Sequence, residues 1–161
     1  MLGSLLFLVV APGTVAVYLP WLFSRWRLQP PFLGVPLTRG LGVALILLGA
    51  PGLLDSFARF ALLGRGTPAP VAPPDRLVVH GLYRFVRNPM YVAVVCVVLG
   101  QALLFGSLPV LEYLAVLWLA FHVFVLAYEE PALRARFGAD YARYCAQVGR
   151  WIPRLTPYRE G

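Results

Sequence analysis

Long apolar stretches alternate with short polar segments along the chain. Four of the stretches are long enough for a helix to cross a bilayer, which takes about 20 mostly apolar residues at 1.5 Å per residue. They cover residues 2–23, 41–63, 89–106 and 110–128, with a polar loop at 64–88 and a polar tail at 129–161. The pattern predicts one all-α integral membrane domain with four transmembrane helices.

The polar segments predict how these helices connect. Only residues 106–109 separate the third and fourth stretches, which favours a tight helical hairpin. In the tail, apolar residues recur every three or four positions from Pro131 onward, as in an amphipathic helix. This stripe consists of Leu133, Phe137, Tyr141, Tyr144 and Val148. We expect a new helix to open at Pro131 and to fold back over the membrane surface, next to the loop 64–88.

Composition and charge agree with a membrane location and indicate an orientation. Of all residues 60% are hydrophobic and 13% are charged, against about 25% charged in an average soluble domain. All 14 basic residues are arginines, and all except Arg59 lie outside the apolar stretches without forming a cluster, so no nucleic-acid partner is expected. Ten of them lie in the loop 64–88 and the tail, which the positive-inside rule places in the cytoplasm. We expect both termini on the cytoplasmic side of a bacterial-type cell membrane.

Few polar residues lie inside the apolar stretches. Asp55 and Arg59 are four positions apart and can form an ion pair on one helix face, and Gln101 is expected to contact another helix. His122 lies on the same predicted face as Glu129, about 10 Å further into the membrane at 1.5 Å per residue. His122 is therefore a candidate substrate residue lining an acceptor channel, or a partner in an interhelical hydrogen bond.

The first candidate site lies where the loop 64–88 meets the third apolar stretch. Asn88 is a favoured N-cap residue and Pro89 a favoured first helical residue, so the pair can simply start a helix. A helix N-terminus also presents free N–H groups and a partial positive charge, which suit an anionic ligand, and Arg87 adds a positive charge there. Tyr83 and Tyr91 are placed to pack against a flat ring.

The second candidate site is the pair Glu129 and Glu130 at the end of the fourth stretch. The pair can be a solvated helix end. Acidic residues at a helix C-terminus nevertheless oppose the helix dipole, which favours a role such as binding a cation or ribose hydroxyls. The two cysteines lack the spacing of metal ligands and lie in different regions, so neither a metal site nor a disulfide is expected.

Taken in order, these residues resemble the isoprenylcysteine carboxyl methyltransferase and phospholipid methyltransferase family of membrane enzymes. The family pattern is Gly-x-Tyr-x-x-x-Arg-His-Pro-x-Tyr, then Glu-Glu, then Phe-Gly-x-x-Tyr-x-x-Tyr, then Arg-x-x-Pro. The matching residues are Gly81, Tyr83, Arg87, Asn88, Pro89, Tyr91, Glu129, Glu130, Phe137, Gly138, Tyr141, Tyr144, Arg150 and Pro153. Asn88 stands where the family has His, so a proton-transfer role does not carry over to this position.

The resemblance implies methyl transfer from S-adenosylmethionine at the cytoplasmic face to a lipid-like or hydrophobic acceptor. It places the cofactor contacts at Leu77, Val78, Tyr83, Arg87, Asn88, Pro89, Met90, Tyr91, Glu129 and Glu130. The residue chemistry agrees with this set. Arg87 and the helix N-terminus suit the cofactor carboxylate, and the tyrosine rings suit the adenine. Glu129 or Glu130 suits the ribose, the amino group or the sulfonium region.

The acceptor and two other functions stay open at this stage. A carboxylate acceptor is already ionised at neutral pH, whereas an amine has to lose a proton to Glu129, Glu130 or His80. One alternative is a nicotinamide-dependent membrane reductase of the sterol-reductase type, which shares part of the Arg-His-Pro-x-Tyr pattern but carries Asn where this chain has Met90. Another is a non-catalytic membrane scaffold.

Overall fold

In the computed structural model, residues 10–63, 77 and 79–158 are described, and every regular element among them is helical. The N-terminal helix (Val10–Ser24) contains a π-turn at Thr14–Tyr18 and ends in α2 (Leu19–Ser24). The remaining elements are a 3-10 turn (Phe32–Gly34), α3 (Leu37–Leu63), a second 3-10 turn (Gly81–Arg84), α4 (Pro89–Phe105), α5 (Leu108–Phe124), a second π-turn (Val125–Glu129) and α6 (Glu130–Gln147). The all-α prediction is therefore confirmed for the described part of the chain.

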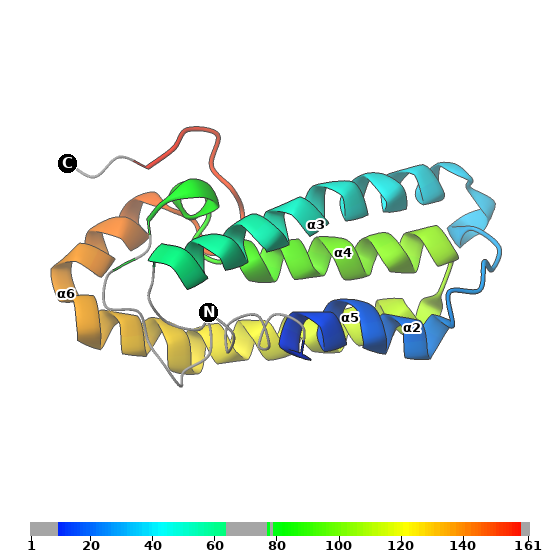
Figure 1. The fold of residues 1–161 in the computed structure, drawn as a ribbon, viewed down its shortest axis with the longest axis horizontal. Coiled ribbons are helices and arrows are strands. Elements are labelled where there is room, and N and C mark those ends of the chain that lie inside the picture. The colour runs from blue at the N-terminus through cyan, green and yellow to red at the C-terminus, as the bar shows by residue number, and fades with distance from the viewer. Residues whose placement is uncertain (1–9, 64–76, 78, 159–161) are drawn as a thin grey trace.

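The helices form an elongated bundle in which α4 lies between α3 on one side and α5 with α2 on the other (Figure 1). Its core includes the fully buried Val98, Ala102 and Val110. Glycines allow α3 and α4 to approach closely. A Cβ atom on Gly42 would lie 2.7 Å from the carbonyl oxygen of Gly100, a distance that side chains do not tolerate. Small residues at a helix–helix contact are typical of packing inside membranes.

Much of the outer surface is apolar. Leu41, Leu47, Leu48 and Leu54 of α3 are all exposed, a pattern that soluble monomers avoid over large areas. Two helical stretches, Leu37–Ser56 and Leu108–Gln147, are long and apolar enough to cross a membrane. Val10–Ser24 and Pro89–Phe105 are shorter apolar helices, so their spanning roles stay predictions.

Each of the two π-turns lies just ahead of a proline. Thr14–Tyr18 is followed by Pro20, and Val125–Glu129 is followed by Pro131. Proline has no N–H and crowds the carbonyl four residues before it, and a local π-turn is one way in which helices accommodate this. Both irregular turns thus precede a proline, whereas Pro51 lies inside α3 without a π-turn.

The first π-turn leaves backbone carbonyls that α4 and α5 satisfy. Because Pro20 has no N–H, the carbonyl of Ala16 lacks its helical donor, and Gln101 of α4 donates to it at 2.6 Å. The N–H of Leu19, the residue before Pro20, donates to the Thr14 carbonyl at the start of the π-turn. The Val15 carbonyl accepts a hydrogen bond from the Tyr113 hydroxyl at 2.9 Å. These bonds hold the N-terminal helix in place, and they give Gln101 the interhelical contact expected of it.

The fourth apolar stretch and the tail helix are continuous, contrary to the expected new helix at Pro131. Pro131 lies in the first turn of α6, which runs on from α5 through the π-turn. The chain changes direction instead at Gly138, whose φ of 49° and ψ of −120° are not helical. Glycine adopts this positive φ without steric cost. The bend turns the second half of α6 back toward the start of α4 (Figure 1).

The apolar stripe of α6 packs inside the protein. Tyr141, Tyr144 and Val148 form a buried cluster with Val79, and Leu133, Phe137, Leu77 and Tyr158 pack around it. The stripe was expected to lie on the membrane surface. Instead, the segment that precedes α4 covers these side chains. The side chain of Arg59 and residues 64–76 and 78 lie outside the described part, so the Asp55–Arg59 ion pair stays a prediction.

Candidate functional site

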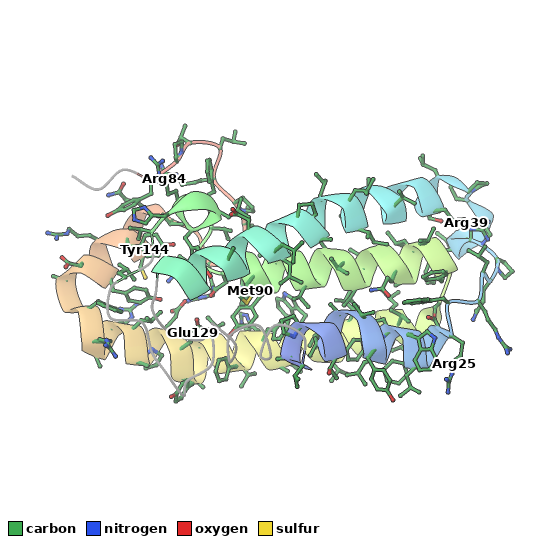
Figure 2. All side chains as sticks on the ribbon, viewed as in Figure 1. Arg25, Arg39, Arg84, Met90, Glu129 and Tyr144 are labelled. Carbon is green, nitrogen blue, oxygen red and sulfur yellow. The ribbon has the colours of Figure 1, made fainter. Side chains whose placement is uncertain are left out.

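A cavity of about 150 Å3 opens where the segment before α4, the π-turn after α5 and the N-terminal helix meet. Figure 2 shows two of its residues, Met90 and Glu129, at the end of the bundle opposite Arg25 and Arg39. The lining residues are Ala11, Pro12, Val15, Tyr83, Arg87, Asn88, Met90, Tyr91, Val94, Phe121 and Glu129. Arg87, Asn88 and Glu129 are the charged or amide residues among them, the two tyrosines add hydroxyl groups, and the other side chains are apolar.

The second π-turn decides which residues of this helix face the cavity. In an uninterrupted α-helix, seven positions make about two turns, which is why His122 and Glu129 are predicted to share a face. A π-turn adds one residue to a turn, so Phe121, eight positions before Glu129, shares its face instead. Phe121 and Glu129 both line the cavity, and His122 does not.

Glu129 is held at the cavity by Tyr91. The Tyr91 hydroxyl donates to Glu129 Oε2 at 3.1 Å, and the Tyr91 ring packs on Phe121 with their centroids 4.6 Å apart. Burial and the neighbouring charge of Glu130 raise the pKa of Glu129 above its ordinary value, although the Tyr91 hydrogen bond partly opposes them. A cation placed in the cavity would stabilise the charged form of this carboxylate.

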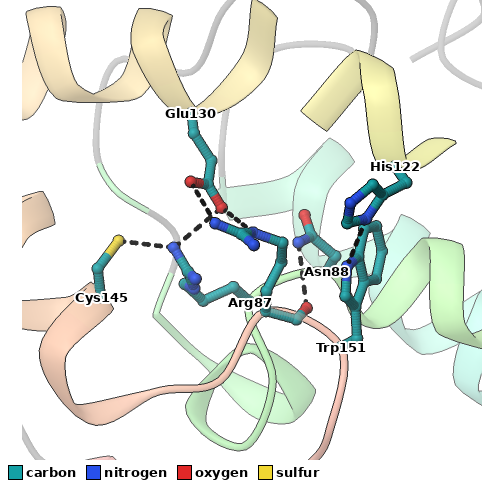
Figure 3. A network of polar contacts seen from close by, with 7 residues as sticks. Arg87, Asn88, His122, Glu130, Cys145 and Trp151 are labelled. Atoms are coloured by element: carbon teal, nitrogen blue, oxygen red, sulfur yellow. Dashed lines mark hydrogen bonds and ion pairs between the residues drawn. The ribbon is translucent and has the colours of Figure 1, made fainter. Parts of the chain in front are cut away.

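Glu130 faces away from the cavity into an ion-pair network (Figure 3). It is only 6% exposed and accepts from Arg150 Nε at 2.5 Å and Arg150 Nη2 at 3.0 Å, while Arg87 Nη1 lies 3.1 Å away. Burial by itself would raise the pKa of Glu130, but the Arg150 hydrogen bonds and the charges of the surrounding arginines outweigh it and lower the pKa. The two adjacent acids therefore occupy different environments.

Arg87 connects the cavity to this network. It lines the cavity, and its Nη1 lies 2.8 Å from the Cys145 sulfur as well as near Glu130 (Figure 3). Its Nε is buried and has no hydrogen-bond partner among the described residues. A buried donor without a partner beside a cavity suits an anionic ligand group.

The C-terminal segment, residues 149–158, lies along the loop that precedes α4. Backbone bonds join Arg87 N–H to the Gly149 carbonyl, Arg154 N–H to the Phe85 carbonyl, and Tyr158 N–H to the Arg84 carbonyl. Asn88 is buried before α4 but makes no capping hydrogen bond through its side chain. Its Nδ2 donates instead to the Arg150 carbonyl at 3.1 Å, so the predicted N-cap residue holds the C-terminal segment.

His122 also contacts this segment. Its Nδ1 accepts a hydrogen bond from Trp151 Nε1 at 3.1 Å, as Figure 3 shows, and its ring stacks on Trp118 with 4.9 Å between centroids. Trp151 in turn lies edge-on to the cavity residue Tyr91, with centroids 6.4 Å apart. The hydrogen bond of His122 thus goes to the C-terminal segment and not to another helix, and its role as a substrate residue stays a prediction.

The predicted cofactor residues fall into two groups. Six line the cavity: Tyr83, Arg87, Asn88, Met90, Tyr91 and Glu129. Leu77 packs against α6, Pro89 is buried in the first turn of α4, Glu130 is ion-paired, and Val78 lies outside the described residues.

Sequence reasoning missed several supporting residues. Arg150 and Tyr144 belong to the family pattern, and that pattern is the sequence signal by which their supporting role could have been found. Tyr144 donates to the Tyr83 carbonyl at 2.6 Å. The cavity residues Ala11, Pro12 and Val15 carry no recognisable motif, because their role depends on where the N-terminal helix packs.

Fold and site together define a helical membrane protein with a largely apolar cavity, lined also by Arg87 and Glu129, toward one end of its bundle. The family model described as phospholipid methyltransferase matches residues 37–140, and the chain belongs to this family. A probable protein-S-isoprenylcysteine O-methyltransferase from Oryza sativa subsp. indica is 34% identical over 79 residues, which are 48% of this chain and 41% of that protein. The protein-S-isoprenylcysteine O-methyltransferase of Tribolium castaneum is 34% identical over 84 residues, which are 52% of this chain and 30% of that protein. The matches thus span less than half of these relatives, and no solved structure matches the chain.

Proposed function

We propose that this protein transfers a methyl group from S-adenosylmethionine to a lipid-like or hydrophobic acceptor at the cytoplasmic membrane face. The observation that carries the proposal is the cavity, which joins Arg87, the first turn of α4 and Glu129 in one space with an apolar wall. Membership of the phospholipid methyltransferase family supports it. Membership of this family favours a methyltransferase over the nicotinamide-dependent reductase.

The start of α4 suits the cofactor carboxylate. The Val92 N–H donates to the Asn88 carbonyl, so the N–H groups of Met90 and Tyr91 precede the first backbone bond of the helix and have no acceptor within it. These groups and the partial positive charge of the helix end attract an anion. Arg87, with its unpartnered Nε, adds a full charge beside them.

Glu129 suits the cationic and hydroxyl groups of the cofactor. It is the acid that lines the cavity, whereas Glu130 is already bonded to Arg150 and Arg87. We therefore assign contact with the ribose, the amino group or the sulfonium region to Glu129, and a supporting role to Glu130. The rings of Tyr83 and Tyr91 line the same cavity and are assigned to the adenine.

S-adenosylmethionine, when bound, supplies an electrophilic methyl group: the acceptor's lone pair bonds the methyl carbon while the carbon–sulfur bond breaks and leaves its electron pair on sulfur. The protein's task is then to align the groups, and positioning alone can supply a large part of the acceleration. A carboxylate acceptor needs no base. For an amine acceptor, Glu129 is the base to test, since it lies in the cavity with a raised pKa, whereas His80 is exposed.

Calorimetric titration of the purified protein with S-adenosylhomocysteine and, separately, with NADPH tests the proposal. We expect S-adenosylhomocysteine to bind, and Arg87→Ala and Glu129→Gln each to weaken binding about tenfold or more, as expected for loss of a hydrogen bond to a charged group. Arg143→Ala and Asp140→Asn are matched controls, because this exposed pair on α6 lies away from the cavity residues. Binding of NADPH alone, or unchanged affinity in both site variants, would contradict the proposal. Labelled methyl transfer into a lipid extract then tests the acceptor class.

A further inference from the structure

Two large apolar side chains of the C-terminal segment, residues 149–158, point away from the protein. Ile152 is 81% exposed and Leu155 is 99% exposed. We propose that both side chains enter the bilayer at the boundary between headgroups and acyl chains, and thereby hold the C-terminal segment on the membrane. This surface goes beyond the proposed methyl transfer and does not depend on it.

The backbone around Leu155 is fixed, so this side chain has a defined position. On one side, the Arg154 N–H donates to the Phe85 carbonyl at 2.9 Å, and on the other the Tyr158 N–H donates to the Arg84 carbonyl at 2.8 Å. Arg84 Nε donates in turn to the Tyr158 carbonyl at 2.8 Å. The segment therefore presents Leu155 outward as part of the folded structure.

Trp151 places the start of the segment against a stretch of α5 that is apolar enough to cross a membrane. Its Nε1 donates to His122 (Figure 3), and its ring centroid lies 6.5 Å from that of Trp118, which is 42% exposed. Leu119 and Leu126 are also exposed, and on a helix both lie within about 100° of Trp118. The apolar outer face of α5 thus continues onto the C-terminal segment.

The loop that is bonded to the segment borders a second apolar stretch, Leu37–Ser56 of α3. A Cβ atom on Gly52 would lie 3.6 Å from Leu82 Cδ1 of this loop. Gly52 is about 6 Å along the helix from the end of the stretch at Ser56, at 1.5 Å per residue. These contacts place the segment at the level where a bilayer passes from acyl chains to headgroups.

The side chains of the segment have the chemistry of this boundary. Tryptophan is enriched at membrane interfaces, and arginines close to the surface attract anionic headgroups. Arg154 stands between Ile152 and Leu155 in the sequence, and Trp151 precedes all three. Because Trp151 also lies edge-on to the cavity residue Tyr91, the docked segment brings the membrane interface next to the candidate site.

Photo-crosslinking in lipid nanodiscs tests the contact. The full-length protein carries p-benzoylphenylalanine in place of Leu155, in nanodiscs of phosphatidylcholine and phosphatidylglycerol in equal parts. After irradiation, mass spectrometry should show protein with one lipid attached. The same amino acid in place of Arg143 is the matched control, because this side chain is 72% exposed in a polar pair on α6, and it should give no lipid adduct.

Three outcomes of this experiment would overturn the proposal. They are the absence of a lipid adduct from position 155, an equal yield from the control position, and a cross-link to a second copy of the chain in place of lipid. Since Leu155 is almost fully exposed, its replacement leaves the packing of the protein unchanged.

Removal of the apolar side chains should also loosen the segment. In the double variant Ile152→Ser and Leu155→Ser, hydrogen exchange of the Arg154 and Tyr158 amides in the same nanodiscs should become about tenfold faster or more, since apolar burial no longer opposes opening. Leu33→Ser is the matched control, because Leu33 is 97% exposed in the turn before α3, and it should leave this exchange unchanged.

Unchanged exchange in the double variant would overturn the proposal, because it would show that the bilayer does not hold the segment. Neither measurement involves S-adenosylhomocysteine. Failure of the proposed function therefore leaves both results interpretable, and loss of the bilayer contact leaves the proposed function to its own test.

Discussion

At the scale of single residues, Glu129 and Glu130 show how neighbours of identical chemistry come to differ. Adjacent side chains on a helix point about 100° apart, so Glu129 reaches the cavity while Glu130 reaches Arg150 and Arg87. Burial raises the pKa of Glu129, whereas arginine partners outweigh burial and lower the pKa of Glu130. The sequence predicts that the pair is important but does not assign the two roles.

The lowered pKa of Glu130 predicts that the stability of the folded protein depends on pH. Because its pKa is lower in the folded than in the unfolded protein, its contribution is fully present above the ordinary glutamate pKa of about 4.3 and is lost as pH falls through the folded value. We expect Glu130→Gln to lower the thermal midpoint in detergent at neutral pH, by an amount corresponding to about 1–3 kcal/mol. The difference from wild type should shrink below about pH 4.

Thermal melts of wild type and Glu130→Gln across this pH range measure the effect. Asp140→Asn serves as the control, since Asp140 is 70% exposed in a surface pair with Arg143, and such pairs contribute little. A Glu130→Gln penalty that stays constant as the pH falls would contradict the assignment.

At the scale of helices and turns, prolines control the register of the site. Pro131 follows the π-turn that lets Glu129 and Phe121 share the cavity, as Pro20 follows the π-turn that presents Val15. The missing N–H of proline favours such a turn, although Pro51 in α3 has none. The effect of the two turns on which side chains face the cavity appears only when the helices pack.

Replacing Pro131 should therefore change the binding of S-adenosylhomocysteine while leaving the helix intact. Pro131→Ala allows the helix to return to α geometry, which rotates Glu129 by about 100° relative to Phe121. We expect calorimetry to show that S-adenosylhomocysteine binds about tenfold more weakly than to wild type, or weaker still. The circular dichroism spectrum should remain that of a helical protein. Pro109→Ala, at an exposed position in the first turn of α5, is the control and should keep wild-type affinity. Unchanged affinity in Pro131→Ala would show that the π-turn does not need this proline.

At the scale of the whole molecule, charge is unevenly distributed between the two ends of the bundle. Arg84, Glu129 and Tyr144 lie at one end, and Arg25 and Arg39 at the other (Figure 2). Ten of the 14 arginines belong to the loop 64–88 and the tail, and the described parts of these segments lie at the end of the bundle that bears the cavity (Figure 1). From the positive-inside rule we therefore propose that this end faces the cytoplasm.

Reporter fusions test the orientation. A fluorescent protein fused after Gly161 should be fluorescent in a bacterial host, and alkaline phosphatase at the same point should be inactive. Replacing Arg143 and Arg154 with alanine should leave the orientation unchanged, since most of the arginine bias remains. An active phosphatase fusion would place the tail and the cavity outside.

Local signals in the sequence were sufficient for the helical class, the start of α4 at Pro89, the short connection between α4 and α5, and the grouping of Arg87 with Tyr91. These features depend on apolar periodicity, on the restricted backbone of proline and on the freedom of glycine, all of which act over a few neighbouring residues. They also carry the resemblance to the family.

Packing decided the remainder of the site. The N-terminal helix became a cavity wall, Asn88 came to hold the C-terminal segment, and His122 came to bond Trp151. Each of these contacts joins residues far apart in the chain, and no local pattern marks such partners. Even the choice between Glu129 and Glu130 required the tertiary structure, because a single added residue in one turn rotates every side chain that follows it.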